Sequence, residues 1–486
     1  MGLTIPQNPA GDIWLPDNPV FQFNKGGDFL TFGDLYSGIL CTGAPRSGKT
    51  SCVLALLRRI VLRMGLGCAV FTTKRDDAEP WLKDAKLYGR EQDIIHATVE
   101  SGHCFDPITH EMRRGGGAGA GNPLNIVKML MTLSQVGKPV ITSNGDDASA
   151  FFRNSMEQLL RAAITILAAA NEPPSITNIR SLINSLPPVP IPENPDRHTP
   201  EINDWFAESY LGRLITRVID RNSAGEVSPD RWRATEHSTE ILAKEYPNLA
   251  PATLTSILQT AMSVIDKLLT PPFDRIVAGG RCTYVPEQCY LEGKILLLDY
   301  NLSEFGEAGE LCQIANKLAL QGAIMRRDVS KYPRPVALFG DEFQTLAIVE
   351  DSRFAEIARS QRGCCIYATQ NLQNVARRLH EHNPGAGTLS LVGNMQTRIY
   401  LQNGESEFTN EWAAKSFGRA HENIIEGSLH GPHMRSDYRF LVEPATFASL
   451  PTPTRESPYA VGVVYRGGQV WRETGTPYLF FGFPRF

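Results

Sequence analysis

Residues 43–50 read GAPRSGKT and fit the pattern of a phosphate-binding loop, GxxxxGK[ST]. In such a loop glycines let backbone N–H groups curl around phosphate oxygens, and the dipole of the following helix adds to the attraction. Lys49 is expected to neutralise the β- and γ-phosphate oxygens of a nucleoside triphosphate, and Thr50 to hold Mg²⁺. A chance match in a loop is the alternative, but a strand-like run precedes this motif and a helical run follows it. The residues expected to bind nucleotide are Gly43, Arg46, Ser47, Gly48, Lys49, Thr50 and Cys52.

A nucleotide site of this class also needs an acidic strand end, and VALFGDEFQ (336–344) supplies one. The apolar run ends at Gly340, so Asp341 is expected to reach the metal ion by way of water. Glu342 is expected to polarise the attacking water and joins Lys49 as a candidate catalytic residue. An apolar run followed by two acids also arises by chance, but here it accompanies a phosphate-binding motif. The expected metal-binding residues are therefore Thr50 and Asp341.

The stretch ARSQRGCCIYATQN (358–371) places polar residues on both sides of an apolar run of strand type. In a parallel sheet the strand after the acidic one lies beside it, so this run is expected to end near the γ-phosphate. Gln370 is a candidate catalytic sensor of the γ-phosphate or the attacking water; alternatively it merely ends a strand. Arg359 or Arg362 is a candidate catalytic arginine finger for a neighbouring subunit, because a helix end is too far from its own phosphate. The alternative for both is a solvated surface arginine.

Strands and helices alternate around these motifs. Strands are expected at 36–43 and 68–73, separated by the helix-periodic run SCVLALLRRIVLRMG. Further strands are expected at 294–300, 336–340, 364–369 and 397–402, and a hairpin at 459–471 that turns at Gly467 and Gly468. This alternation predicts an α/β fold with a parallel sheet.

Between residues 142 and 270 the sequence changes character. ASAFFRNSMEQLLRAAITILAAAN, EINDWFAESYLGRLITRVIDR and LTSILQTAMSVIDKLL are helix-periodic, with Ser, Thr or Asp near their starts. An all-alpha insertion is therefore predicted. The expected organisation is an N-terminal arm (1–35), a nucleotide-binding domain in two parts (36–141 and 271–475), the all-alpha insertion (142–270) and an aromatic C-terminal tail (476–486).

Composition limits how the chain can bind DNA or a membrane. Its 48 Lys and Arg against 52 Asp and Glu give a formal net charge of −4, so any DNA contact is expected to be local, such as a lined channel. No window of 18 or more predominantly apolar residues occurs, so no membrane span is expected and the cytosol is the default location. The nine cysteines are expected to be mostly buried free thiols. Neither Cys282 with Cys289 nor His380-Glu381-His382 has a second ligand pair at zinc-like spacing, so no metal ligand is expected there.

Together these motifs resemble the type IV coupling proteins of conjugation and type IV secretion, which are TraG/TraD-like members of the FtsK/HerA superfamily of DNA-pumping ATPases. The matching pieces, in family order, are GAPRSGKT, NPLNIV (122–127), the helical insertion, GDEFQTLA, ARSQRGCCIYATQNLQNV, GNMQTRIYLQ and VEPATFASLP (442–451). The resemblance implies a RecA-like P-loop nucleotide-binding domain interrupted by an all-alpha domain. It also implies hexameric rings around a DNA channel with ATP and Mg²⁺ at subunit interfaces, and it favours Arg359 over Arg362 as the finger.

Two features depart from the family pattern. Coupling proteins typically begin with a transmembrane segment, and this sequence is expected to have none, so either a partner recruits it to the membrane or it has another task in the cytosol. The loop at 72–77 reads TTKRDD, where the family usually has an acidic residue before its lysine. The function of Lys74 and Arg75 is therefore open, and lining a DNA path is one interpretation.

Two hypotheses on function follow. In the first, the chain is an ATP-hydrolysing hexameric motor that moves DNA through its ring, while the helical domain selects cargo. In the second, it is a nucleotide-switched cytosolic platform that recruits a relaxase, an effector, a defence partner or a membrane-complex protein without pumping DNA. The acidic net charge and the missing anchor favour the second slightly. The aromatic tail TPYLFFGFPRF (476–486) bears on both, since it is expected either to pack on its own domain or to dock on a partner.

Overall fold

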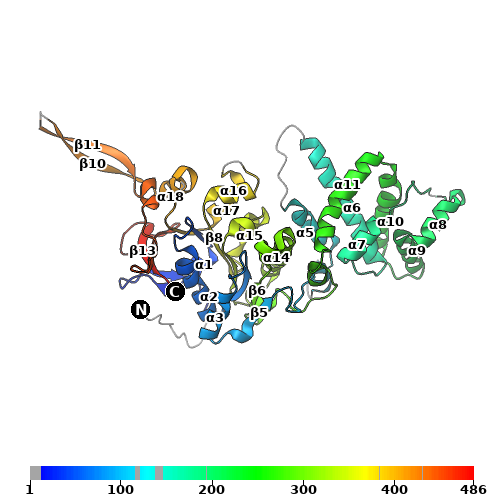
Figure 1. The fold of residues 1–486 in the computed structure, drawn as a ribbon. Coiled ribbons are helices and arrows are strands. Elements are labelled where there is room, and N and C mark those ends of the chain that lie inside the picture. The colour runs from blue at the N-terminus through cyan, green and yellow to red at the C-terminus, as the bar shows by residue number, and fades with distance from the viewer. Residues whose placement is uncertain are drawn as a thin grey trace. The chain divides into compact units, whose positions relative to one another are not determined.

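The computed structural model describes residues 12–114, 121–136, 146–192, 194–381, 384–404, 406–428 and 431–486 (Figure 1). Of the residues considered above for a metal site, His382 lies outside the described residues. The chain divides into two compact units, of which the first is Met1–His96, Pro286–Glu304 and Ala319–Phe486, and the second is Ala97–Val285 and Phe305–Leu318. The domain boundaries expected from the sequence remain a prediction.

The first unit is built on a nine-stranded sheet in the order β13-β12-β9-β3-β8-β7-β4-β6-β5. The pairs β9–β3, β3–β8, β8–β7, β7–β4 and β4–β6 are parallel, whereas β13–β12 and β12–β9 are antiparallel. The expected α/β class with a mainly parallel sheet is confirmed. The strands are β3 (Ile39–Thr42), β4 (Gly67–Phe71), β5 (Ile94–Ala97), β6 (Ile295–Leu298), β7 (Val336–Gly340), β8 (Gly363–Thr369), β9 (Thr397–Tyr400), β12 (Tyr459–Arg466) and β13 (Tyr478–Pro484).

The central strands correspond to the six strands predicted before the hairpin. Every residue of β3, β4, β6, β7, β8 and β9 is buried. Parallel strands that are covered on both faces bury both rows of side chains, which is why β3, β4, β6, β7 and β8 read as largely apolar runs, whereas β9 also contains the buried Arg398. Because β3, β7 and β8 are parallel neighbours, their carboxyl ends meet at one edge of the sheet, where such folds bind ligands.

Helices accompany the strands of the first unit. A π-helical turn, Lys49–Leu54, leads into α2, and α14 belongs partly to each unit, with a non-helical residue at Gly306 (φ 51°). The helices are α1 (Phe32–Tyr36), α2 (Ala55–Arg63), α3 (Glu79–Leu87), α13 (Gln288–Leu291), α14 (Leu302–Arg326), α15 (Glu350–Ala358), α16 (Leu372–Arg378), α17 (Ala386–Asn394), α18 (Glu411–Phe417) and α19 (Pro444–Ala448).

The hairpin expected at 459–471 is wrong in its second strand. The partner of β12 is β13, so the turn at residues 467–468 does not lead into the second strand. Trp471, which the expected strand would contain, is fully buried instead and packs against Phe23 with ring centres 5.0 Å apart. The second strand was predicted wrongly because the local sequence does not distinguish an apolar residue in a loop that fills the core from one in a strand. The aromatic C-terminal segment is thus largely an edge strand that packs on its own unit.

The N-terminal arm is tied to the C-terminal strands. It contains an antiparallel pair, β1 (Pro19–Gln22) and β2 (Phe29–Thr31), followed by α1. The carboxylate of Asp34 in α1 accepts hydrogen bonds from Nε (3.0 Å) and Nη2 (2.7 Å) of Arg466 in β12. Both residues are buried, and a bidentate pair of this kind fixes orientation as well as distance.

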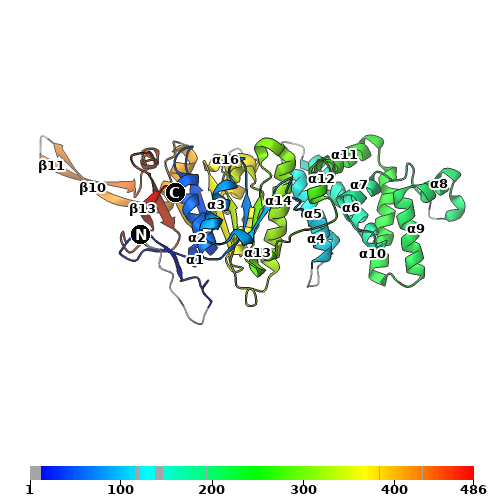
Figure 2. The same ribbon diagram turned by 60° about the horizontal axis from the view of Figure 1, so that its bottom comes forward.

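A separate two-stranded antiparallel sheet projects as a long ribbon in the first unit (Figure 2). Its strands are β10 (Arg419–Ser428) and β11 (Gly431–Phe440). At its base the guanidinium of Arg419 lies 4.0 Å from the ring centre of Phe440, a cation–π contact that joins the two strand ends.

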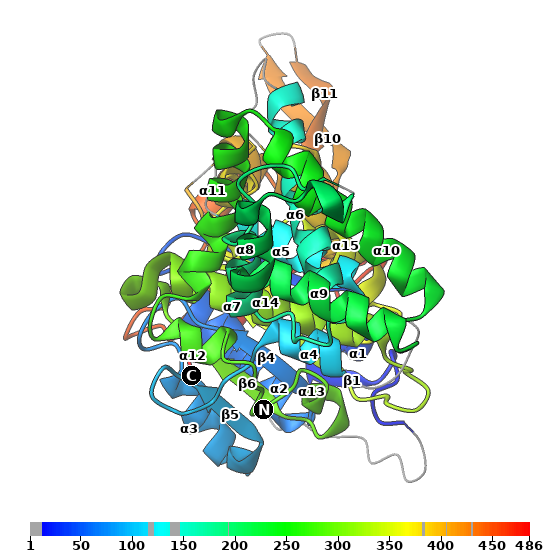
Figure 3. The same cartoon turned by 90° about the vertical axis from the view of Figure 1, so that its right-hand side faces the viewer.

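The second unit consists of helices, apart from an isolated bridge between Phe105 and Cys282, in the part of it that the structure describes (Figure 3). The long helix α6 packs against α5, α7, α9, α10 and α11. Ser175 and Ser209 cap the starts of α7 and α9 through their hydroxyl oxygens, which explains the polar residues at these helix starts. The expected all-alpha domain is confirmed. Its helices are α4 (Pro107–Arg113), α5 (Pro123–Gln135), α6 (Asp146–Ala169), α7 (Ile176–Ile183), α8 (Pro200–Glu208), α9 (Tyr210–Ser223), α10 (Pro229–Glu240), α11 (Pro251–Leu268) and α12 (Phe273–Val277).

All nine cysteines are free thiols, as expected, and all except Cys282 are buried. Burial raises the pKa of Cys41 and of Cys289 to about 12, so both remain protonated at neutral pH. Within the residues that the structure describes, no helix combines the length and the apolar character that crossing a membrane requires.

Gly67 offers a test of the packing beneath the sheet. A Cβ at this first residue of β4 would lie 2.0 Å from the carbonyl oxygen of Cys289, which belongs to the backbone and cannot move aside easily. Gly67→Ala is therefore expected to lower the free energy of unfolding by about 2–4 kcal/mol, measured by urea denaturation. Gly393→Ala in α17 is the control, because its Cβ would have no neighbour within 4 Å and alanine favours a helix. Equal urea midpoints for the two variants would contradict this packing.

Candidate functional site

The phosphate-binding loop lies between β3 and the π-helical turn that precedes α2. Its backbone is left-handed at Arg46 (φ 67°) and at Gly48 (φ 97°), and alternation of left- and right-handed residues is typical of anion-binding turns. The backbone N–H of Ala44 donates to the carbonyl oxygen of Gln402 beyond β9 (2.7 Å). The loop is thus held at the carboxyl edge of the sheet, with its shape set by the backbone.

Gly48 is a loop position at which a side chain would be both strained and crowded. Its φ is left-handed, and a Cβ would lie 2.6 Å from Cβ of Ala460 in β12 and 3.3 Å from Cδ of Pro453. A Cβ at Gly43 would lie 2.5 Å from Oγ of Ser47. Residues on and just before β12 therefore form the surface on which the phosphate-binding loop rests.

The ammonium group of Lys49 is turned back onto this loop. Its Nζ donates to the carbonyl oxygens of Gly43 (2.6 Å) and Ala44 (3.2 Å), and the residue is 6% exposed. Two neutral carbonyl oxygens compensate a buried ammonium group less well than an anion does. The amine is therefore held where phosphate oxygens would be its better partners.

Thr50 and Asp341 bring a hydroxyl and a carboxylate together. Asp341 follows the last residue of β7, and its Oδ2 accepts a hydrogen bond from Oγ1 of Thr50. Burial raises the pKa of Asp341, while the hydrogen bond from Thr50 opposes that rise. A buried carboxylate beside a hydroxyl oxygen is a suitable pair of ligands for Mg²⁺, which prefers oxygen and would neutralise the acid. These residues fit the ion expected from the sequence.

Glu342 adopts a left-handed backbone conformation (φ 53°, ψ 43°), which is uncommon for a residue with a side chain and concentrates at functional sites. Its carboxylate accepts hydrogen bonds from Nε2 of Gln344 (2.6 Å) and of Gln370 (3.1 Å), and Nζ of Lys74 lies 3.5 Å away. Burial acts to raise the pKa of Glu342, but the hydrogen bond from Gln344 and the charges of Lys49 and Lys74 outweigh it. The pKa therefore lies below its ordinary value. The carboxylate is ionised at neutral pH and able to accept a proton or to orient water.

Gln370 reaches Glu342 because of the strand order. It follows β8, which pairs in parallel with β7. The amides of Gln344 and Gln370 thus approach one carboxylate oxygen, Oε2 of Glu342, from two directions. The structure places Gln370 where a sensor would have to be, and its role as a sensor stays a prediction.

Lys49, Thr50, Glu342 and Gln370 line a pocket of about 740 Å³. The expected residues Gly43, Ser47, Cys52 and Asp341 are not on its wall. Cys52 is fully buried and its backbone N–H donates to the carbonyl oxygen of Gly48 (2.9 Å), so it supports the loop from below. The wall consists of Ala44, Pro45, Arg46, Gly48, Lys49, Thr50, Ser51, Thr73, Lys74, Leu302, Glu342, Gln344, Thr345, Gln370, Pro453 and Arg485.

Comparison with known proteins shows which family model and which solved structures the chain is similar to. Residues 335–451 match the family model described as the TraM recognition site of TraD and TraG. The chain is also similar to solved structures of TrwB, a bacterial conjugative coupling protein. Unbound TrwB has a TM-score of 0.61 at 14% identity, covering 95% of this chain and 88% of that chain. TrwB with ADP and Mg²⁺ has a TM-score of 0.57 at 13% identity (96% and 89% covered), and TrwB with a non-hydrolysable ATP analogue 0.58 at 14% (96% and 89%).

The resemblance to the TraG/TraD-like coupling proteins is confirmed. At this level of identity the solved structures establish the coupling-protein fold, and the family match covers the segment that contains β7, α15 and β8. No curated protein matches the sequence significantly.

In this coupling-protein fold the two candidate finger arginines have different surroundings. Both precede β8, whose seven residues separate them from the nucleotide edge by about 20 Å. Arg362 pairs with Asp12 and donates to the carbonyl oxygen of Pro333 (2.9 Å). The side chain of Arg359, at the end of α15, is exposed and has no hydrogen bond or ion pair with the residues that the structure describes. Arg359 is therefore the better candidate for reaching another subunit.

Ten residues of the pocket wall were not assigned to it from the sequence, and four of them carry polar or ring groups that bear on the site. Gln344 lies within the GDEFQ motif, where its spacing from Glu342 was a signal that could have been used. Lys74 was noted but left open, and its loop is fixed because Asp77 accepts hydrogen bonds from the backbone N–H groups of Thr73 (2.9 Å) and Lys74 (2.8 Å). Pro453 and Arg485 reach the pocket through long-range strand pairing, for which the local sequence holds no signal.

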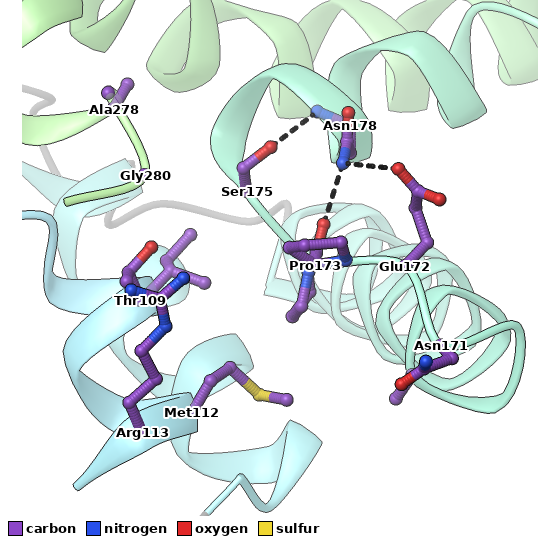
Figure 4. Close-up of a pocket in the computed structure, with 14 residues that line it drawn as sticks. Thr109, Met112, Arg113, Asn171, Glu172, Pro173, Ser175, Asn178, Ala278 and Gly280 are labelled. Carbon is purple, nitrogen blue, oxygen red and sulfur yellow. Dashed lines mark hydrogen bonds between the residues drawn. The ribbon is translucent and has the colours of Figure 1, made fainter.

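The second unit has a pocket of its own, of about 520 Å³ (Figure 4). Asn178 donates from Nδ2 to the carbonyl oxygen of Pro173 (2.8 Å) and to the carboxylate of Glu172 (3.4 Å), so part of the polar wall is internally satisfied. Arg113 is the one basic residue among the described residues of the wall. A triphosphate needs several cations and a turn of backbone N–H groups, so the nucleotide site is assigned to the first unit alone.

Proposed function

We propose that the chain is an Mg-ATP-hydrolysing coupling ATPase that moves DNA through a hexameric ring, in the manner of conjugation or type IV secretion. The observation that carries the proposal is the meeting of Lys49, Thr50, Glu342 and Gln370 around one pocket, with Asp341 bonded to Thr50 behind its wall. These residues come from the carboxyl ends of three parallel neighbours, β3, β7 and β8. The TrwB structures with ADP and Mg²⁺ and with an ATP analogue support ATP and Mg²⁺ as the ligands.

In the proposed mechanism each residue of the site has a separate role, which follows from its position. Lys49 leaves the loop carbonyls and neutralises the β- and γ-phosphates, while Thr50 and Asp341 hold Mg²⁺, which supplies charge neutralisation at the phosphates. Glu342, held ionised, orients the attacking water and accepts its proton, and Gln370 orients the same water or the γ-phosphate. Arg359 acts on the ATP of the neighbouring subunit.

A protein partner is part of the proposal. The matched family model is described as the TraM recognition site of TraD and TraG, and it covers the segment that includes β10 and β11. We therefore place a partner-binding surface on residues 335–451. This match is also the observation that favours the second function, recruitment of a partner without DNA pumping.

Two measurements test the motor. ATP hydrolysis is measured with and without single-stranded and double-stranded DNA, and particles are imaged by negative stain with ATP and DNA present. The motor requires stimulation by one of the DNAs and a six-fold ring. A monomer whose hydrolysis ignores both DNAs, and which captures protein partners in a nuclease-treated extract, supports recruitment instead.

Glu342→Gln isolates the chemical step. The amide keeps the size of the side chain but cannot accept the proton from water, so hydrolysis is expected to fall by about 10²–10³-fold while ATP still binds. Phosphate release and equilibrium binding of ATP are measured side by side. Glu79→Gln, on the exposed first turn of α3, is the matched control and should leave both unchanged. If Glu342→Gln hydrolysed ATP at the original rate, another residue would have to be the base.

A further inference from the structure

Arg485 is brought to the nucleotide pocket by the last strand of the sheet. It directly follows β13 and lines the same pocket as Lys49 and Thr50. Its backbone N–H donates to the carbonyl oxygen of Pro458 (2.8 Å), which extends the pairing of β13 with the segment before β12. The side chain is exposed and has no hydrogen bond or ion pair with the described part of the chain.

The neighbour of Arg485 anchors it beside the phosphate-binding loop. The backbone N–H of Phe486 donates to the carbonyl oxygen of Ser51 (3.1 Å), the residue that follows Thr50. The guanidinium of Arg59 in α2 lies 4.2 Å from the ring centre of Phe486. Arg485 is therefore fixed at its backbone on both sides, although its side chain is free to meet a ligand.

The strand order decides which part of a nucleotide Arg485 would meet. Glu342 and Gln370 reach the pocket from β7 and β8, on one side of β3, whereas Arg485 comes from β13 on the other side. Since Glu342 and Gln370 act at the γ-phosphate in the proposed function, the nucleoside end points away from them. Pro453, whose Cδ would lie 3.3 Å from a Cβ on Gly48, lines the pocket with Arg485.

We propose that Arg485 stacks its planar guanidinium on the nucleobase, with the ring of Pro453 as a neighbouring apolar surface, and so forms the nucleoside part of the site. This inference rests on the proposed function, because it needs a nucleotide whose phosphates lie in the loop. An arginine plane accepts the face of any base, so the contact serves affinity without selecting adenine over guanine.

The test compares ligands that share the phosphates but differ in the base. Binding of MgATP, MgGTP and magnesium tripolyphosphate is measured by calorimetry on the full chain. Arg485→Ala is expected to weaken ATP and GTP by about tenfold, which lies between the values for exposed and for desolvated cation–π contacts, and to leave tripolyphosphate unchanged. Arg485→Lys keeps the charge but not the plane and should restore little. Arg455→Ala, in the same exposed loop as Pro453 but outside the pocket, is the matched control.

Three other results would contradict the proposal or the function on which it rests. If Arg485→Ala weakens tripolyphosphate as much as ATP, Arg485 binds phosphate and the proposal is overturned. If it binds ATP as the original chain does, Arg485 has no contact with the nucleotide and the proposal is overturned as well. If the unmodified chain binds neither ATP nor tripolyphosphate, the proposed function is wrong. This inference, which rests on that function, is then wrong as well.

Discussion

Replacing Lys49 with alanine is expected to reduce ATP hydrolysis by about a thousandfold or more and to weaken ATP binding. The amine of Lys49 is the buried cation nearest to the loop, where two carbonyl oxygens now hold it. Without it, the charge that develops on the phosphates during hydrolysis would lose its closest compensating group. The measurement is the rate of phosphate release from MgATP, with binding of the ATP followed separately.

Lys83→Ala is the matched control for this experiment. Lys83 lies on α3 in the same unit and is exposed, so its loss removes one positive charge without touching the pocket. Its hydrolysis should equal that of the original chain. If the Lys49 variant retained more than a tenth of the original rate, residues 43–50 would not be the catalytic phosphate-binding loop.

Replacing Arg359 with alanine is expected to abolish hydrolysis, by about 10³–10⁵-fold, while ATP binding is spared. The reason is position, because Arg359 is exposed at the end of α15, about 20 Å along β8 from its own nucleotide edge. It has to act in a neighbouring subunit if it acts at all. Arg353→Ala, on another side of the same helix, is the control for loss of an exposed arginine.

Mixing two inactive variants tests whether Arg359 acts across subunits. In a ring that contains Lys49→Ala and Arg359→Ala subunits, some interfaces combine an intact phosphate-binding loop with an intact arginine. Hydrolysis should therefore return on mixing, although each variant alone is inactive. Rings that assemble but stay inactive after mixing would remove Arg359 from this role.

Arg362→Ala tests the second candidate for the arginine finger. This arginine already pairs with Asp12 and the carbonyl oxygen of Pro333 in its own chain, so its loss should lower stability more than the rate. A loss of hydrolysis as large as that of the Arg359 variant, in a folded protein, would transfer the role to Arg362.

The parts of the site that could be predicted from the sequence are those coded by short local patterns. GAPRSGKT and GDEFQ name their residues directly, and the buried runs VALFG and CCIYAT identify β7 and β8 because strands covered on both faces are apolar throughout. The proximity of Gln370 to Glu342 followed from one topological rule, that consecutive parallel strands are neighbours. The motif does not say which side chains face the ligand, and Cys52, which was expected to bind nucleotide, has a fully buried side chain.

The parts that could not be predicted depend on contacts between distant segments. The pairing of β12 with β13 skips a core-filling loop around Trp471, and no local pattern distinguishes that loop from a strand. Arg485 enters the pocket only through this pairing. Lys74 was visible as an unusual lysine, but its distance of 3.5 Å from Glu342 depends on β4 lying beside β7.

The packing of Gly48 against Ala460 and Pro453 decides when the phosphate-binding loop can form during synthesis on the ribosome. The phosphate-binding loop leaves the ribosome roughly 400 residues before Pro453 and Ala460, against which it packs. At ordinary rates of synthesis roughly 20 to 80 s pass between the two. A nascent chain that stops short of β12 therefore holds a phosphate-binding sequence without the surface that shapes it, so ATP binding is expected only after β12 has been synthesised.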